Sequence, residues 1–395
     1  MFRFRNLCLR SNHTDSDDDE RSRKSKDPHR RSKRKQKGGP SSAPLKVGSY
    51  AISPRLLGRG ATGVVHEGEH RLTGDMVAIK IVESQATSAP NEVVALRRVA
   101  AMHHPNICSF YEHYFGNGKH YIVMEACEGG ELFQQVEASG HLTEERARHL
   151  AGGMVSGVAY MHARGVSHRD LKLENVLLDI SGTVPKICDF GLAHVYERGS
   201  DGRYIHVRLT RCCGTKSYTP PEVLQAMPYD GFLVDVWSLG VCIFAMVAGF
   251  FPLEVAKNSD WRYQRLIVAQ QEGRSTVETI YAFYDRTCPF SAPLADLLDG
   301  MLQINPHRRA TLKQVSASPW LPPEPGTRVT TNLELGALGH STVSIHSSAC
   351  SPSSLSSTSY APFATDEWEA LDLHTSVPRD RSFREIGEGG HREGA

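Results

Sequence analysis

Cysteine is sparse and irregularly spaced in this chain. The 395 residues include nine cysteines, and the adjacent pair Cys212 and Cys213 lacks the two-residue gap of a metal knuckle. We therefore expect neither a disulfide framework nor a structural zinc site. The sequence shows no recognisable secretory signal, so we expect a reducing interior compartment, the cytoplasm, the nucleus or both.

Long uncharged apolar runs are also scarce. Residues 236–253 form one run of 18 residues without a charge, which is the lower limit for a membrane-spanning helix. The run directly follows Asp235, contains Ser238 and ends in Gly-Phe-Phe-Pro-Leu, a pattern that favours a buried central helix. We therefore expect a soluble protein without a membrane partner.

The net charge is only +1 at pH 7, but the charges are unevenly spread. Residues 1–40 hold 13 Lys and Arg against 6 Asp and Glu, so the remainder of the chain is net acidic. Residues 1–46 cannot bury enough apolar surface to offset the entropy of ordering, which predicts a disordered basic tail. The cluster at residues 29–35 has nuclear-import composition; a solvated tail that touches nucleic acid or other anions loosely is an equally good interpretation.

The most informative stretch is residues 168–175, His-Arg-Asp-Leu-Lys-Leu-Glu-Asn. It places Asp170, Lys172 and Asn175 in one loop, and the apolar residues 176–178 can anchor that loop on a core. Fourteen residues after Asn175 comes Asp189, followed by Phe-Gly. Phosphoryl transfer needs such a set: we expect Asp170 to accept the proton of the attacking hydroxyl, and Asn175 and Asp189 to hold Mg²⁺ on the phosphates.

Together these two motifs resemble those of the eukaryotic protein kinase family. The resemblance covers residues 50–320 and implies an α+β bilobal fold, with a small, mostly antiparallel β N-lobe that carries one helix and a larger α-helical C-lobe. It implies ATP and Mg²⁺ as cofactors, with Asp170, Lys172 and Asn175 as catalytic residues. Lys172 would neutralise the charge that develops on the transferred phosphoryl group.

A glycine-rich stretch at residues 57–65 lies between two strand-like segments, and its glycines would let the backbone close over phosphates. It is followed by a β-propensity run that ends in Lys80, which favours a kinase over a dinucleotide-binding fold. A helix is expected over residues 91–102. The resemblance implies that Glu92 in this helix pairs with Lys80, although an ordinary solvated charge is the alternative for Glu92.

Residues 121–125 are expected to form a buried strand, and residues 126–130 a flexible joint. By resemblance Met124 is the gatekeeper, while Glu125 and Cys127 offer backbone groups to adenine. The resemblance assigns cofactor binding to Leu57, Gly58, Arg59, Gly60, Ala61, Thr62, Gly63, Val65, Ala78, Lys80, Glu92, Met124, Glu125, Cys127, Leu177 and Asp189.

The resemblance also implies two contacts that hold the C-lobe together. Glu222 closes a Pro-Pro-Glu triplet, where the family usually has alanine first, and is expected to pair with Arg309. Asp235 is expected to begin the central helix and to hold the backbone of the catalytic loop.

Residues 192–218 read as a long, polar activation segment. In many kinases the arginine that corresponds to Arg169 binds a phosphothreonine in this segment. Here Arg211 occupies the position where the AMP-activated-kinase-like branch has that threonine. We therefore expect activity without phosphorylation of the loop, with Thr210 as the alternative switch.

Residues 324–395 are Ser/Thr-rich and are predicted to be disordered. A mixed acidic and aromatic island at residues 363–373 is either a docking segment or a chance cluster. The expected organisation is thus a tail over residues 1–46, a kinase domain over 50–320 and a second tail over 324–395.

A lysine at position 172 and a threonine after Gly214 resemble the pattern of serine/threonine kinases. Within these, the sequence resembles the calcium/calmodulin-dependent kinase group and is nearest its checkpoint-kinase and AMP-activated-kinase-like branches. We expect a monomer whose partners are protein substrates carrying Ser or Thr. Glu131 and Glu174 match positions that meet an arginine upstream of the target residue. Two other functions remain: an inactive pseudokinase scaffold, and nucleic-acid or chromatin binding through the basic tail, which would weaken steeply with salt.

Overall fold

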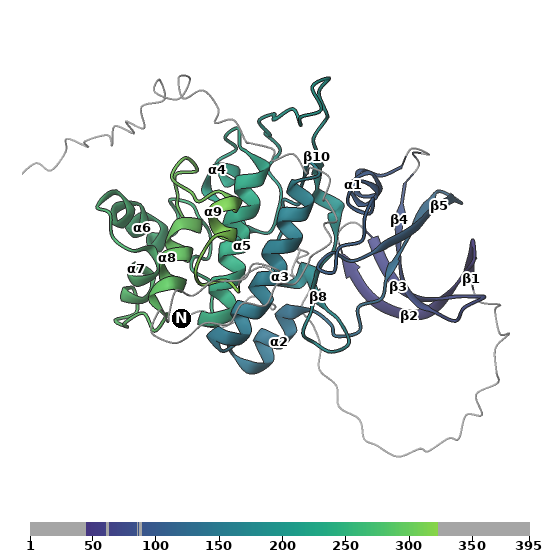
Figure 1. Cartoon of the computed structure of the whole chain (residues 1–395), viewed down its shortest axis with the longest axis horizontal. Coiled ribbons are helices and arrows are strands. Elements are labelled where there is room, and N and C mark those ends of the chain that lie inside the picture. Colours follow the sequence, from purple (N-terminus) through teal and green to yellow (C-terminus); the bar gives the residue numbers. More distant parts are fainter. Residues whose placement is uncertain (1–44, 61–62, 85, 87–88, 323–395) are drawn as a thin grey trace, which may run out of the picture. The chain divides into compact units, whose positions relative to one another are not determined.

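A computed structural model of the chain describes residues 45–60, 63–84, 86 and 89–322 (Figure 1). Most of the predicted N-terminal tail and the whole predicted tail 324–395, with its island at 363–373, lie outside the described residues. So do Ala61 and Thr62 of the glycine-rich stretch. The prediction that the disordered tail extends to residue 46 is wrong at its end, because Leu45 and Lys46 pair with Ile52 and Ala51 as a short strand.

The N-lobe is built on a six-stranded antiparallel sheet. Across the sheet the strands are β1 (Leu45–Val47), β2 (Tyr50–Gly60), β3 (Gly63–His70), β4 (Met76–Glu83), β6 (Lys119–Glu125) and β5 (Phe110–Gly116). Val77 and Ile79 of β4 pack with Tyr121 and Val123 in a cluster on one face of the sheet. Because side chains alternate along a strand, Lys80 lies on the opposite face, where it reaches the C-lobe residue Asp189.

Helix α1 (Asn91–Val99) is shorter than the expected helix over residues 91–102. The hydroxyl of Tyr160 donates hydrogen bonds to the carbonyl oxygens of Val99 and Met102. The first of these carbonyl groups belongs to the last residue of the helix and is one of those that a helix end leaves without an intrahelical partner.

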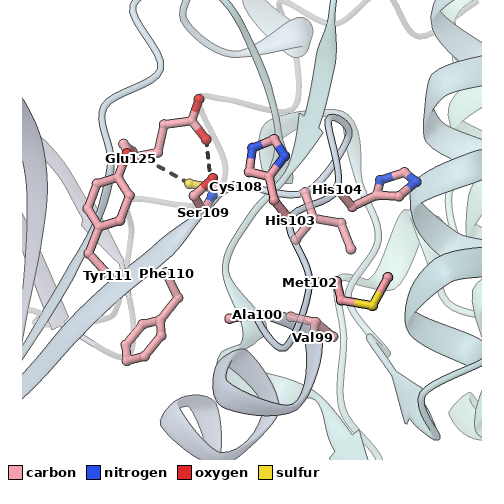
Figure 2. A pocket seen from close by; sticks show the side chains of 11 residues that line it. Val99, Ala100, Met102, His103, His104, Cys108, Ser109, Phe110, Tyr111 and Glu125 are labelled. Atoms are coloured by element: carbon pink, nitrogen blue, oxygen red, sulfur yellow. Dashed lines mark hydrogen bonds between the residues drawn. The ribbon is translucent and has the colours of Figure 1, made fainter.

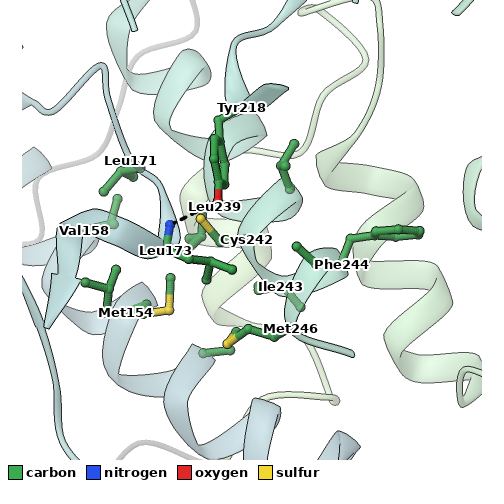
Figure 3. Close-up of a cluster of buried hydrophobic side chains, with 14 of the residues drawn as sticks. Met154, Val158, Leu171, Leu173, Tyr218, Leu239, Cys242, Ile243, Phe244 and Met246 are labelled. Carbon is green, nitrogen blue, oxygen red and sulfur yellow. Dashed lines mark hydrogen bonds between the residues drawn. The ribbon is translucent and has the colours of Figure 1, made fainter. Parts of the chain in front are cut away.

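The C-lobe is mainly helical, as the resemblance implied. Its helices are α2 (Leu132–Ser139), α3 (Glu144–His162), α4 (Pro221–Leu224), α5 (Gly231–Ala248), α6 (Trp261–Gln271), α7 (Thr276–Ala282), α8 (Ala292–Met301) and α9 (Leu312–Ser316). Figure 3 shows where α3 and α5 contribute to the core, with Met154 and Val158 of α3 near Leu239, Ile243 and Met246 of α5. These two helices form the support on which the catalytic loop rests.

Helix α5 is the part of the described chain that is long and apolar enough to cross a membrane. However, 78% of this 18-residue window is buried inside the protein, as expected for a buried central helix. The helix begins at Gly231 and not at the predicted Asp235. The side chain of Asp230 accepts a hydrogen bond from the N–H of Phe232 at 2.8 Å and so caps the helix, which starts four residues before Asp235.

Four short strands carry the polar loops of the C-lobe. They are β7 (Val166–Ser167), β8 (Val176–Leu178), β9 (Pro185–Ile187) and β10 (His194–Val195), which pair antiparallel as β7 with β10 and β8 with β9. The catalytic loop lies between β7 and β8, and Asp189 follows β9. The two strand pairs therefore bring residues 168–175 and Asp189 to the same region of the C-lobe.

Candidate active site

Lys80 of β4 connects the two lobes. Its Nζ donates to the carboxylate oxygens of Glu92 at 2.7 and 2.8 Å and to Asp189 Oδ1 at 2.8 Å. Burial lowers the pKa of Lys80, but the two carboxylates outweigh this effect and raise it above its ordinary value. Burial raises the pKa of Asp189, but the ammonium of Lys80, together with His168 and the N–H of Gly191, outweighs this effect and lowers it below its ordinary value. Lys80 is thus held as a cation and Asp189 as an anion.

Asp170 is held by groups on both sides of its carboxylate. Its Oδ1 accepts hydrogen bonds from the N–H and the hydroxyl of Thr215, each at 2.9 Å. Its Oδ2 lies 2.9 Å from Lys172 Nζ, and the amide nitrogen of Asn175 donates to Asp170 O at 2.9 Å. These contacts fix the direction of the Asp170 carboxylate, which is the expected proton acceptor.

The same amide makes Asn175 suitable as a metal ligand. Because its nitrogen donates to Asp170, its oxygen is left to coordinate a cation, and no described residue donates to that oxygen. The side chain of Asp189 is 39% exposed and so keeps oxygen lone pairs accessible. An amide oxygen and a carboxylate are hard oxygen donors of the kind that Mg²⁺ prefers.

The backbone of the catalytic loop is held in a conformation that most residues avoid. Arg169 and Asp189 have positive φ angles of 64° and 59°. Asp235 of α5, which is fully buried, accepts hydrogen bonds from the N–H groups of His168 and Arg169, both at 2.8 Å. His162 contacts the same carboxylate at 2.8 Å. Asp235 therefore holds the loop from inside the core, as the resemblance implied, and opposes the local strain.

The glycine-rich stretch is the hairpin between β2 and β3. Leu57, Gly58, Arg59 and Gly60 are in β2, and Gly63 and Val65 are in β3, where Gly58 pairs with Val65 and Gly60 with Gly63. A Cβ atom on Gly63 would collide with the carbonyl oxygen of Ile81, so this position requires glycine.

The remaining candidate residues for adenine binding come from both lobes. Ala78 of β4 pairs with Met124 of β6, and Met124 packs against the main core cluster. Leu177 of β8 forms an isolated bridge with Glu131, which follows the joint at residues 126–130. The bridge places Leu177, Glu131 and the joint that contains Cys127 close to one another. The side chain of Glu125 points away from this set to Lys186 Nζ at 2.9 Å and the N–H of Ser109 at 3.1 Å, so only its backbone is left for adenine.

Glu131 and Glu174 form an acidic pair beside the catalytic loop. Burial is the main reason that the pKa of each carboxyl is raised, and Glu174 raises that of Glu131 further. The hydroxyl of Tyr218 donates to Glu174 at 3.0 Å, and neither glutamate forms an ion pair with a described Lys or Arg. The pair therefore presents negative charge that a basic ligand could neutralise.

A buried ion pair anchors the end of the activation segment to the C-lobe. Arg309 donates to both oxygens of Glu222, at 2.6 and 3.0 Å, and its side chain is fully buried. Gly214 has φ of 97°, and a Cβ there would lie 2.9 Å from Arg169 O, so glycine lets the segment pass close to the catalytic loop. This approach is what brings Thr215 to Asp170.

Three residues outside the predicted site set contribute to it. By resemblance Thr215 marks a serine/threonine kinase, and the sequence does not predict its contact with Asp170. Tyr218 accepts a hydrogen bond from the N–H of Leu173 at 3.4 Å (Figure 3), and Tyr229 accepts one from Arg169 at 3.1 Å. No local pattern marks either tyrosine, because each contact spans 45 or 60 residues of sequence.

A two-lobed fold with a lysine–glutamate pair, a supported catalytic-loop aspartate and a second aspartate between the lobes defines the class of the protein kinases. Residues 52–321 match the protein kinase domain. The chain belongs to the protein kinase family. Membership implies ATP and a divalent metal ion.

Several curated proteins are similar to this chain. CBL-interacting protein kinase 19 of Oryza sativa subsp. japonica is 37% identical over 72% of this chain and 52% of its own length. CBL-interacting serine/threonine-protein kinase 19 of Arabidopsis thaliana is 37% identical over 70% of this chain and 54% of its own. Serine/threonine-protein kinase SIK2 of Gallus gallus is 34% identical over 72% of this chain and 33% of its own length. The chain thus spans about half the length of the plant relatives it matches.

Proposed function

We propose that the protein is an ATP-dependent serine/threonine kinase that transfers the γ-phosphate of ATP to Ser or Thr hydroxyls of protein substrates. The observation that carries this proposal is the set of contacts around Lys80 and Asp170. Lys80 bonds Glu92 and Asp189, while Asp170 is aimed by Thr215 and Lys172. Family membership and the names of the relatives support the same activity.

Each of these residues has a proposed role in the transfer. Lys80, fixed by Glu92, would bind the α- and β-phosphates, and the backbone of the β2–β3 hairpin would cover them. Asp170 would orient the substrate hydroxyl and accept its proton late in the reaction. Lys172 would neutralise the negative charge that spreads over the transferred group. Mg²⁺ held by Asn175 and Asp189 would supply further neutralisation of phosphate charge.

For the substrate, we propose a preference for an arginine about three residues before the target Ser or Thr. Glu131 and Glu174 supply two carboxylates without a described ion-pair partner, and a guanidinium matches such a pair. Some relatives carry another acidic residue at the position of Ala245, which is fully buried in α5. Because alanine has no charge, demand for a second basic residue should be weaker. A peptide array tests this proposal, and proline-directed or acidic preference would contradict it.

An inactive scaffold is the main alternative. It predicts that the purified protein neither autophosphorylates nor phosphorylates Ser/Thr peptides when ATP and Mg²⁺ are present, even if it binds nucleotide. Transfer of labelled phosphate to Ser/Thr peptides would support the kinase proposal. We further propose that the protein acts in the cytoplasm, the nucleus or both, on the basis of its cysteine content and basic tail. We also propose that it acts as a monomer.

A further inference from the structure

Two cysteines lie together behind the adenine side of the candidate site. Cys108 precedes β5, and Cys127 belongs to the joint after β6. The N–H of Glu125 donates to Ser109 O at 2.9 Å, beside the Phe110–Met124 pair, so the two cysteines lie just past the end of the β5–β6 ladder. Their sulfur atoms and a carboxylate oxygen of Glu125 all lie within 4.8 Å of one another.

We propose that Cys108 and Cys127 form a modification site, a dithiol that a hydroperoxide converts into an intrachain disulfide. A disulfide needs a sulfur–sulfur distance of about 2.05 Å. The two sulfurs lie within 4.8 Å of one another, so they have to approach further to form this bond.

The two thiols differ in a way that suits the two steps of this oxidation. Cys127 is half-buried and can meet an oxidant first, whereas Cys108 is 4% exposed. The Cys127 sulfur attacks one peroxide oxygen and becomes a sulfenic acid, releasing water once protons are balanced. The Cys108 sulfur then attacks the Cys127 sulfur and expels a second water. Two thiols lose two electrons in total, and one hydrogen peroxide is reduced to two waters.

Figure 2 shows the environment of Cys108. Its side chain lies next to Glu125, with Sγ 3.5 Å from the carbonyl oxygen of that residue. A cavity of about 320 Å³ is lined by Cys108 and Glu125 and also by His103, His104 and Tyr111. Water fits this space, so the water that the attack of Cys108 expels has room to leave beside that thiol.

A metal ion is the competing occupant of this cluster, and the surroundings disfavour it. Lys186 Nζ lies 2.9 Å from the Glu125 carboxylate and would repel a cation held there. Two thiols and one shared carboxylate are also one ligand short of the four that a structural zinc site uses. Cys188 is the nearby alternative thiol; its sulfur donates to Asn175 O at 3.4 Å and does not belong to the close group.

The disulfide would act on nucleotide binding, and this part rests on the proposed function. Glu125 and Cys127 are the joint residues whose backbone groups are proposed to meet adenine. A covalent link from Cys127 to Cys108 would displace the thiol that contacts Glu125 O and restrict the joint. We expect oxidation to weaken ATP binding, and reduction to restore it.

The test is peptide mapping of the full-chain protein after treatment with hydrogen peroxide and alkylation without reduction. A linked peptide that joins Cys108 to Cys127 is expected. It should vanish in Cys108→Val and in Cys108→Ser, two variants of a residue outside the catalytic and binding set, and persist in Cys212→Ser, which removes an exposed thiol. The KM for ATP should rise at least about tenfold on oxidation and recover with dithiothreitol, while oxidised Cys108→Val keeps its KM.

Three results would overturn the proposal. They are absence of the linked peptide at peroxide concentrations that fully oxidise Cys212, a link that runs through Cys188, and stoichiometric zinc in the purified protein that Cys108→Val loses. A protein that transfers no phosphate under any condition would refute the proposed function, whereas the peptide map would still decide whether the disulfide forms.

Discussion

Thr215 connects the two charged groups that the catalytic loop brings to the reaction. Its hydroxyl lies 2.9 Å from Asp170 Oδ1 and 3.0 Å from Lys172 Nζ. Spacing within the loop predicts Asp170 and Lys172, because both lie in one short motif. The contact with Thr215 depends on a chain that returns 45 residues later, and the sequence alone does not show where it returns.

Replacing this hydroxyl should impair the chemical step. We expect Thr215→Val to lower kcat by about 10- to 100-fold with little change in the KM for ATP, because Asp170 loses a hydrogen bond that aims it. Thr215→Ser keeps the hydroxyl and is the matched control. Steady-state kinetics on a Ser peptide measure both variants, and equal kcat values for Thr215→Val and wild type would contradict the positioning role.

The acidic pair gives a pH dependence with a defined sign. Burial, first of all, raises the pKa of Glu131 and Glu174 above the ordinary value of 4.5, so each gains its proton at a higher pH than an exposed glutamate. The carboxylates attract a substrate arginine only when ionised. The preference for arginine over alanine in the peptide should therefore be complete above the raised pKa values and fall as the pH is lowered through them.

The measurement is the ratio of kcat/KM for the arginine and alanine peptides between pH 8 and pH 5. Glu131→Gln is the matched variant, because it keeps the shape of the side chain and removes one titrating charge. It should lower the ratio at pH 8 and flatten its fall with pH. A ratio that stays constant over the whole range in the wild type would contradict the assignment.

At the scale of elements, Arg169 and Tyr229 connect the catalytic loop to the activation segment. Arg169 donates to Leu192 O at 2.8 Å and to the hydroxyl of Tyr229 at 3.1 Å, and that hydroxyl donates to Arg211 O at 2.6 Å. Burial is the main cause that raises the pKa of Tyr229 to about 12, so the hydroxyl stays neutral. Tyr229 thus accepts a hydrogen bond from the guanidinium that, by the family resemblance, would otherwise pair with a phosphothreonine.

This arrangement supports the expected independence from phosphorylation of the loop. Protein made in bacteria and treated with phosphatase should keep most of its activity, and Thr210→Ala should behave like the parent. Tyr229→Phe removes both hydrogen bonds and should lower activity by about tenfold or more. If phosphatase and Thr210→Ala each lowered activity a hundredfold while Tyr229→Phe had no effect, Thr210 would be the switch.

Element boundaries were the least predictable part of the fold. Helix α1 ends at Val99, whose carbonyl oxygen accepts a hydrogen bond from Tyr160, a residue 61 positions further along the chain. The start of α5 was within reach of sequence reasoning, because Asp230 is a good N-cap residue. The family motif begins at Asp235, which lies one turn inside the helix. The presence of a strand that carries Lys80 and the buried character of α5 follow from the hydrophobic pattern alone.

At the scale of the molecule, the buried Arg309–Glu222 pair joins the end of the activation segment to the last part of the C-lobe. Arg309→Ala would leave the Glu222 carboxylate buried without its partner, which costs about 3–5 kcal/mol in free energy of unfolding. The exposed pair of Arg55 and Glu67 is the control, and Arg55→Ala should cost less than about 1 kcal/mol. Chemical denaturation measures both, and similar losses would contradict the importance of burial.

The central claim is that Asp170 and Lys80 carry phosphoryl transfer, and one comparison tests it most directly. Wild-type protein, Asp170→Asn and Lys80→Met are assayed for transfer of labelled phosphate from ATP to a Ser/Thr peptide, with thermal unfolding of each protein as the control for folding. The account predicts transfer by the wild type and none above background in either variant, because each substitution removes a group that acts on the transition state and little core volume. Activity within about tenfold of the wild type in either variant would contradict the account.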